Sequence, residues 1–297
     1  MRSSNKNRVR EDRSGVVIKT VSYILMGLGA LICVIPFLHV TAKAISSGTA
    51  VTSGRVQFWP IGLQFETSLY IVNETMFPRA LLNSLIVTGF GTLISLLVTV
   101  TTAYALSKPK LPGRKLLLLL YIFSMLFYGG MIPAYMVIKW LGLLNTHAAL
   151  ILPFVIVQFN MLIVKNSFEA LPESIEESAM LDSAGFFRIL FSIVCPISKP
   201  VIATVALLYA VNYWNNYFHA MLYTNSPTMK TLQLFLYDMV YSSERVMEKI
   251  ISTPHTQISI EGVKAASITF SMIPIILLYP FVQRFFIAGI TIGSVKG

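Results

Sequence analysis

Charged residues are scarce in this chain. Only 12% of its 297 residues are Asp, Glu, Lys or Arg, whereas soluble domains carry about 25%. Hydrophobic residues make up 55% of the sequence, and the mean hydropathy is +0.70. This composition is typical of an integral membrane protein and argues against a soluble domain.

Cysteine is nearly absent. Cys33 and Cys195 are the two cysteines of the chain, and they form neither a CxxC pair nor a cluster with histidine. The sequence therefore predicts no disulfide framework and no metal site. The four histidines stand singly along the chain, and a lone histidine is more often a packed residue than a ligand.

The apolar segments contain no acidic residue. All 13 acidic residues lie outside the six spans expected below, whereas ion-coupled carriers usually keep an ionisable group within the membrane. The sequence also lacks the patterns GxxxxGKS/T, HExxH and GxSxG, which mark phosphate loops, zinc proteases and serine hydrolases. These absences argue against ion coupling, against ATP binding by a phosphate loop, and against a membrane-embedded enzyme.

Six stretches contain the roughly 20 mostly apolar residues that a membrane-spanning helix needs. They are residues 17–42, 81–106, 116–138, 148–165, 201–222 and 266–288. We therefore expect an all-α membrane protein with a six-span domain at 17–288, an N-terminal segment at 1–16 and a tail at 289–297. The first span has about 25 apolar residues, too many for a signal peptide, which predicts an uncleaved anchor.

Basic residues flank the apolar stretches and give the chain a net charge of +10. Most of the 23 lysines and arginines fall on one side if both termini are cytoplasmic, as the positive-inside rule requires. The short loop "KPKLPGRK" at 108–115 is the clearest marker. This distribution indicates membrane topology and argues against a nucleic-acid partner.

The same topology places loops of about 45–79 and 223–265 outside and a long loop of about 166–199 inside. The second outer loop predicts a short helix, because its apolar residues recur at helical spacing. These residues are Leu232, Phe235, Leu236, Met239 and Val240.

The fifth span carries a polar and aromatic stripe. Tyr209, Asn212, Tyr213 and Asn216 follow the spacing i, i+3, i+4 and i+7, which puts them on one face of a helix. Amides and ring faces suit a path for sugar hydroxyls and CH faces. They equally suit hydrogen bonds between helices and an aromatic belt at the lipid interface, so both interpretations stay open.

The inner loop predicts a helix–turn–helix. Pro172 suits a helix start, and the acids that follow it suit the positive end of a helix. Gly185 suits a turn, after which Phe187, Leu190, Phe191 and Val194 recur on one helical face until Pro196 and Pro200 end the helix. Such a shape fits a groove of a partner protein, or it is an amphipathic helix at the membrane surface.

At this point the residues resemble a known family. The run Glu177-Ser178-Ala179, then Leu181 to Gly185, then Pro196 and Pro200, is similar to the EAA loop of binding-protein-dependent ABC importer permeases. The stretches "YGGMIPAYMVIKWLGLLNTHAALILP", "YWNNYF" and "AGITIGSVKG" resemble the maltose-type carbohydrate permeases, especially their oligosaccharide and polysaccharide branch. The resemblance runs from about Leu81 to the C-terminus. Ser178 stands where the family often has alanine, and Ser183 stands where it commonly has the turn glycine, so we expect Gly185 to make the turn.

The resemblance implies partners and site residues. The inner loop would seat in a groove of a cytosolic ATPase dimer, which alone would bind Mg·ATP, through Glu177, Ala179, Asp182, Ala184, Gly185 and Pro196. A tail of Val295, Lys296 and Gly297 would reach the same ATPase. A second homologous permease subunit would complete a heterodimer in the bilayer, and an extracytoplasmic solute-binding protein would deliver the carbohydrate ligand.

The resulting expectation is a transport subunit and not an enzyme. It would be the permease of an ATP-driven carbohydrate importer that works by alternating access. The alternative is a secondary carrier or a channel that no ATPase powers. ATP-dependent uptake separates the two.

Overall fold

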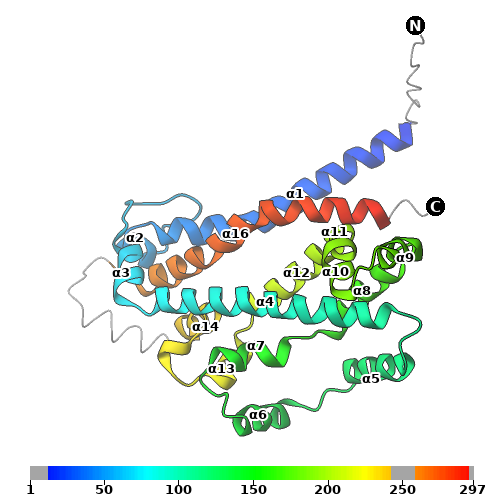
Figure 1. The fold of residues 1–297 in the computed structure, drawn as a ribbon. Helices are drawn as coiled ribbons and strands as arrows, with labels where there is room; N and C mark the ends of the chain where they lie inside the picture. Colours follow the sequence, from blue (N-terminus) through cyan, green and yellow to red (C-terminus); the bar gives the residue numbers. More distant parts are fainter. Residues whose placement is uncertain (1–12, 242–257, 294–297) are drawn as a thin grey trace. The chain divides into compact units, whose positions relative to one another are not determined.

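The computed structural model describes residues 13–241 and 258–293, and every secondary-structure element in these ranges is a helix (Figure 1). The chain divides into two compact units. Unit 1 comprises Met1–Leu69 and Ile250–Thr269, and unit 2 comprises Tyr70–Lys249 and Phe270–Gly297.

Three helical stretches are long and apolar enough to cross a membrane alone. They are Gly15–Ala44 within α1 (Arg13–Ala44), α4 (Phe77–Ser107), and Ile260–Leu277 within α16 (Ile260–Gly293). Three more candidates are pairs of helices that meet at a sharp bend. If each bent pair is one span, the described residues contain up to six spans, in agreement with the predicted number.

The third span is the first bent pair, although the sequence predicted one continuous stretch at 116–138. It consists of α5 (Arg114–Leu126) and α6 (Met131–Trp140), which are bent by 113°. Gly130 lies at the break with φ +91°, a backbone angle that ends an α-helix and that glycine adopts without a steric penalty.

The fourth span is bent by 50°. It consists of α7 (His147–Ile151), the 3₁₀ turn η1 (Leu152–Phe154) and α8 (Gln158–Glu169). Pro153 lies in the turn, where its missing N–H and its ring oppose a regular helix.

The predicted fifth span at 201–222 covers α12 (Lys199–Trp214) and α13 (Phe218–Tyr223), whereas the third bent pair joins Phe186–Ile197 to α12 at 89°. Pro200 lies in the first turn of α12 and therefore begins this helix. The sequence had suggested instead that it ends the preceding helix. Proline is tolerated at that position because the N–H it lacks has no partner within the helix.

Unit 1 contains α1, the short α2 (Gly48–Thr52) and the loop that follows it. Ser46 organises this loop, since its hydroxyl accepts a hydrogen bond from the Ile61 amide at 3.0 Å while donating to the Ala42 carbonyl at 2.6 Å. A small apolar cluster of Ala42, Ala50, Val51 and Val56 lies beside it. The side chains of α1 before this cluster are largely exposed, as expected for a helix that faces lipid.

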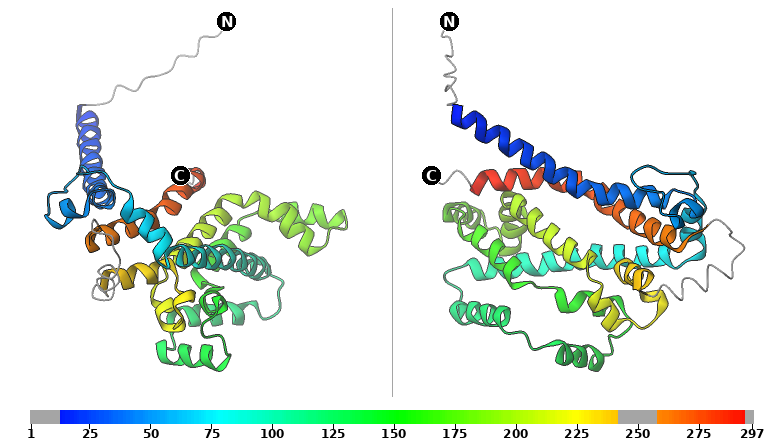
Figure 2. Two further views of the ribbon diagram at one scale, coloured as in Figure 1. Left: turned by 90° about the vertical axis from the view of Figure 1, so that its left-hand side faces the viewer. Right: turned by 180° about the vertical axis from the view of Figure 1, so that it is seen from behind.

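Unit 2 is built around α4. This helix packs against α12 and α8 over much of its length, and α7 and α14 (Leu232–Tyr241) contact its other parts. The main apolar core lies between these helices. Helices α5 and α6 lie below α4 in every view of Figures 1 and 2, and none of the side chains of α5 is buried.

The helix predicted for the loop at 223–265 is confirmed as α14. Asn83 of α4 holds the chain that leads into it, because the Asn83 amide donates to the carbonyls of Thr228 and Lys230 at 2.8 and 2.9 Å. The 3₁₀ turn η3 (Pro227–Met229) lies in this chain. Helix α3 (Glu66–Glu74) lies in the other predicted outer loop, at 45–79.

The contact between α4 and α12 gives a prediction about two glycines of α4. A Cβ on Gly91 would lie 2.8 Å from the Tyr213 ring, whereas a Cβ on Gly89 would meet nothing within 4 Å. Because overpacking a tight contact costs about 1–3 kcal/mol, we expect Gly91→Leu to lower the unfolding temperature of the detergent-solubilised protein. Gly89→Leu is the matched control, and equal unfolding temperatures for the two variants would contradict this packing.

Candidate functional site

The loop at about 166–199 forms the predicted helix–turn–helix. We call Glu173–Ile197 the helix–turn–helix segment; it contains α9 (Glu173–Leu181), α10 (Phe186–Ile189), the π turn η2 (Leu190–Val194) and α11 (Cys195–Ile197). Its second arm meets α12 at 89°. Glu173 and Glu176 lie in the first turn of α9, where the helix dipole favours negative charge.

The turn between the arms is made by Ser183 and not, as we had expected, by Gly185. Ser183 has φ +58°, whereas Gly185 has φ −73° and precedes α10 in extended conformation. The amide of Ser183 donates to the Met180 carbonyl at 2.9 Å, and the amide of Ala184 donates to the Ala179 carbonyl at 3.0 Å. These two bonds are a Schellman ending, whose left-handed position is usually glycine.

The apolar pattern of the second arm is also corrected. Leu190 and Val194 are buried, but Phe187 and Phe191 are exposed, so the four residues do not share one face. Leu190, Phe191 and Val194 lie within the π turn η2, and Phe187 lies before it. Because a π turn adds a residue to the helical repeat, residues on either side of it lose the spacing expected for a regular α-helix.

One face of the segment packs into unit 2. Ala179, Ile189, Leu190 and Val194 belong to its main apolar core, and Ala184 packs against that core. Ala179 is buried and Ala184 is half-buried against this core, whereas the family resemblance had assigned both to the ATPase groove.

An ion pair fastens α9 to the end of α4. The Lys108 ammonium pairs with the Glu176 carboxylate, whose Oε2 also accepts a hydrogen bond from the Tyr104 hydroxyl at 3.4 Å. The same ammonium lies 4.2 Å from the centre of the Tyr104 ring. The charge pattern identified Lys108 as a topology marker and missed this contact, because 68 residues separate the partners along the chain.

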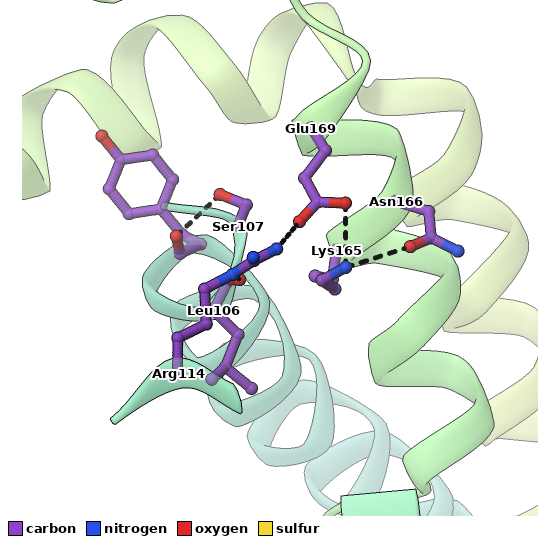
Figure 3. Close-up of polar contacts among 7 residues, drawn as sticks. Leu106, Ser107, Arg114, Lys165, Asn166 and Glu169 are labelled. Atoms are coloured by element: carbon purple, nitrogen blue, oxygen red, sulfur yellow. Dashed lines mark hydrogen bonds and ion pairs between the residues drawn. The ribbon is translucent and has the colours of Figure 1, made fainter. Parts of the chain in front are cut away.

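A second ionic group lies where α8 leads into the segment (Figure 3). Glu169 pairs with Arg114 through one oxygen and with Lys165 through the other, the latter at 2.8 Å. The Arg114 Nε donates to the Leu106 carbonyl at 2.8 Å, which satisfies a carbonyl in the last turn of α4. These contacts join the ends of α4 and α8 beside the segment.

The opposite face of the segment is uncovered in this chain. It presents carboxylates beside large apolar side chains, a combination that marks protein interaction sites when contiguous. The exposed residues are Glu173, Glu177, Asp182, Met180, Leu181, Phe186, Phe187 and Phe191. Leu181 is 87% exposed and Phe187 is 74% exposed. A Cβ on Gly185 would meet nothing within 4 Å, and Pro196 is exposed at the end of the second arm.

The polar stripe of the fifth span is not a single face. Tyr209 and Tyr213 are buried, whereas Asn212 is exposed. Asn216 lies beyond the end of α12, and its Oδ1 accepts a hydrogen bond from the His219 amide at 3.2 Å at the start of α13. Three of the four residues are thus engaged within the protein, which favours the packing interpretation for them.

The described residues contain no group of three or more His, Cys, Asp or Glu side chains that could hold a metal ion. Val295, Lys296 and Gly297, which the family resemblance assigns to a tail, lie outside the described residues.

The sequence matches one family model and several known proteins. Residues 100–292 match the family model of binding-protein-dependent transport system inner membrane components. The chain is 39% identical to protein LplC of Bacillus subtilis over 96% of this chain and 97% of that protein. It is 41% identical to the polygalacturonan/rhamnogalacturonan transport system permease protein YtcP of the same organism, over 90% of this chain and 94% of that one.

Two solved structures are similar to this chain. A chain of a bacterial ABC transporter involved in the import of the acidic polysaccharide alginate superimposes with a TM-score of 0.86 at 34% identity. The superposition covers 93% of this chain and 99% of that chain. A chain from a second alginate transporter structure, at 14% identity and a TM-score of 0.56, shares the fold.

The Schellman ending at Ser183 predicts opposite effects of two substitutions. Ser183→Gly removes a left-handed strain of about 1 kcal/mol, and Ser183→Val adds a β-branched side chain at a position that disfavours it. We expect amide hydrogen exchange of residues 180–184 to slow in the glycine variant and to accelerate in the valine variant. Hydrogen exchange rates in the Ser183→Val variant that equal those of the wild type would contradict the left-handed turn.

The ion pair between Lys108 and Glu176 predicts a charge-swap rescue. Glu176→Lys places two ammonium groups together, so we expect faster hydrogen exchange across α9, and Lys108→Glu combined with Glu176→Lys should restore most of the protection. Glu177→Lys is the control, since Glu177 neighbours Glu176 but is exposed. An unrestored double variant, or an equal effect of Glu177→Lys, would show that the pair does not position α9.

Proposed function

The chain belongs to the family of binding-protein-dependent transport system inner membrane components, and we propose that it is the permease subunit of an ATP-driven carbohydrate importer. The observation that carries the proposal is the helix–turn–helix segment, which is packed into the bundle on one face and uncovered on the other. A permease that lacks its own phosphate loop needs such a surface to receive energy from another subunit.

A cytosolic ATPase dimer is the partner that we assign to the uncovered face. The apolar side chains Leu181 and Phe187 would fill a groove of the ATPase, and Glu177 and Asp182 would meet its basic or amide groups. Gly185 leaves open space on this face, which a partner can occupy. Val295, Lys296 and Gly297 would add a second contact, and Mg·ATP would stay on the ATPase.

Movement of the ATPase would enter the permease at this segment. Glu176 is paired with Lys108 at the end of α4, and Glu169 joins the end of α8 to Arg114. Both pairs are partly buried, so solvent screens them less than it screens a surface pair. Displacement of the segment would therefore displace α4 and α8 and exchange inward-open and outward-open states.

The positive-inside pattern and the family support the rest of the proposed assembly. Both termini would be cytoplasmic, and a second homologous permease would complete a heterodimer in the cell membrane. A solute-binding protein would dock outside on the loops that Asn83 and α14 organise.

Relatives point to the class of ligand. One relative is named as a polygalacturonan/rhamnogalacturonan transport system permease protein. A structural relative belongs to a transporter involved in the import of the acidic polysaccharide alginate. We therefore propose an oligosaccharide or polysaccharide fragment as cargo, and an acidic one first. Asn212, exposed on α12, remains the candidate of the fifth span for contact with such a ligand.

Uptake by proteoliposomes tests this function. The chain would be reconstituted with the second permease subunit, the ATPase and the solute-binding protein. Uptake of labelled oligogalacturonate and malto-oligosaccharide would then be measured under three conditions: with ATP, with a non-hydrolysable ATP analogue, and with an ion gradient alone. We expect saccharide uptake with ATP only. Uptake driven by an ion gradient without ATP would establish the secondary carrier instead, and ATP-driven uptake of a non-saccharide would refute the cargo.

The uncovered face predicts how single variants behave. Glu177→Lys and Gly185→Leu should lower ATPase co-purification and uptake about tenfold or more, as expected for a reversed charge or a filled space at an interface. Their unfolding temperatures should stay at the wild-type value because both positions are exposed. Glu66→Lys makes the same charge change at an exposed residue of the predicted outer loop and should change neither. Normal ATPase binding by both variants would remove the docking proposal.

A further inference from the structure

The break in the fourth span leaves backbone groups that a continuous helix would have paired. The span bends by 50° between the 3₁₀ turn η1 and α8. Inside a bilayer no water is available for such groups, so the protein itself must supply partners. The partners in this case are side chains from another helix.

Two tyrosines of α12 hold the two sides of the break. On one side, the Tyr213 hydroxyl donates to the Ile151 carbonyl at 3.2 Å. On the other side, the Val157 amide donates to the Tyr209 hydroxyl at 3.0 Å. The Tyr209 hydroxyl thus pairs the Val157 amide just before α8, and the Tyr213 hydroxyl gives the Ile151 carbonyl a partner from another helix at the start of η1.

The same two hydroxyls reach α4. Tyr209 pairs with Thr99 at 2.7 Å, and Tyr213 pairs with Ser95 at 2.9 Å. Ser95 and Thr99 are four residues apart on α4, and Tyr209 and Tyr213 are four residues apart on α12. The pairing runs in opposite order along the two helices, as expected for antiparallel helices with two contacts separated by about one helical turn. All four side chains are buried, with Thr99 and Ser95 at 0% exposure.

The position of these bonds in the chain gives them significance beyond packing. Helix α8 leads into the helix–turn–helix segment, and α12 leads out of it. The bond between Val157 and Tyr209 therefore closes a frame of α8, the segment and α12. Since α8 has 12 residues, the closing bond lies about 18 Å along the helix from the segment.

We propose that Tyr209 and Tyr213 are positioning residues that fix the broken fourth span to α12 and α4, so that movement of the segment reaches the residues beyond the break. Tyr209 keeps α8 and α12 moving together. Tyr213 fastens Ile151, on the far side of the break, to the same frame. This inference rests on the proposed function, because it assigns a route for the movement that the ATPase imposes.

A purely structural role predicts something different. If the hydroxyls only stabilise the fold, removing them lowers the amount of active protein, and ATP hydrolysis and transport fall in proportion. If they transmit movement, ATP hydrolysis continues while fewer substrate molecules cross per ATP. The ratio of transported saccharide to hydrolysed ATP separates the two roles.

The experiment uses Tyr209→Phe, Tyr213→Phe and the double variant in the complete reconstituted importer. Phenylalanine keeps the ring and its packing but removes the hydroxyl. Leaving buried hydrogen-bonding partners unsatisfied should lower the transport-to-ATP ratio of the double variant about tenfold. Tyr217→Phe is the matched control, because Tyr217 lies just beyond α12 and its ring stacks on Tyr237 at 5.1 Å; its ratio should equal that of the wild type.

A spectroscopic measurement follows the break directly. Spin labels at Leu152→Cys and Ala170→Cys, both exposed positions, would be placed in a background without Cys33 and Cys195. We expect one narrow distance distribution in the parent and a broad one in the double phenylalanine variant. A narrow distribution together with a wild-type transport-to-ATP ratio in that variant overturns the inference. A parent importer that shows no ATP-dependent uptake refutes the proposed function instead.

Discussion

Backbone amides and carbonyls inside a bilayer must find partners within the protein, and this constraint shapes unit 2 because its spans are interrupted. A regular helix satisfies its own backbone, but the fourth span gives up this advantage between Ile151 and Val157. Tyr209 and Tyr213 form hydrogen bonds with the Val157 amide and the Ile151 carbonyl, and at the same time they join α12 to α4 through Thr99 and Ser95. The contact between α4 and α12 is thus both an apolar seam, closed where Gly91 meets the Tyr213 ring, and a set of hydroxyl bonds.

Polar interactions of two kinds occupy two levels of this bundle. Neutral hydroxyls lie within the spans, where an unpaired charge would be costly. Ion pairs lie at the ends of the helices, where Lys108 meets Glu176 and Glu169 joins Arg114 to Lys165. The charged level surrounds the helix–turn–helix segment, and the neutral level lies farther along α8 and α12. In the proposed importer, a movement of the segment would reach the charged contacts first and the hydroxyl bonds next.

Much of this arrangement could be predicted from the sequence, since apolar run length gave the number of spans and helical spacing gave α14. The apolar spacing expected for the second arm of the helix–turn–helix segment was wrong. The breaks were hidden because Gly130 and Pro153 lie inside runs that are apolar enough to pass as single helices. Ser183 was missed because backbone preference favours Gly185 for a turn, whereas hydrogen bonds to Ala179 and Met180 determine which residue becomes left-handed. The roles of Tyr209, Lys108 and Arg114 depend on partners far away in the sequence. Spacing shows which residues share a helical face, but it does not show which helix will cover that face.

The central claim is that the uncovered face of the helix–turn–helix segment receives the ATPase. Photo-cross-linking tests it most directly, with a benzoylphenylalanine residue placed at Leu181 or Phe187 and, as control, at the exposed Trp140. The account predicts cross-links from Leu181 and Phe187 to the ATPase subunit and none from Trp140. Cross-links from Leu181 and Phe187 to lipid alone, in an importer that still hydrolyses ATP and transports saccharide, would contradict it.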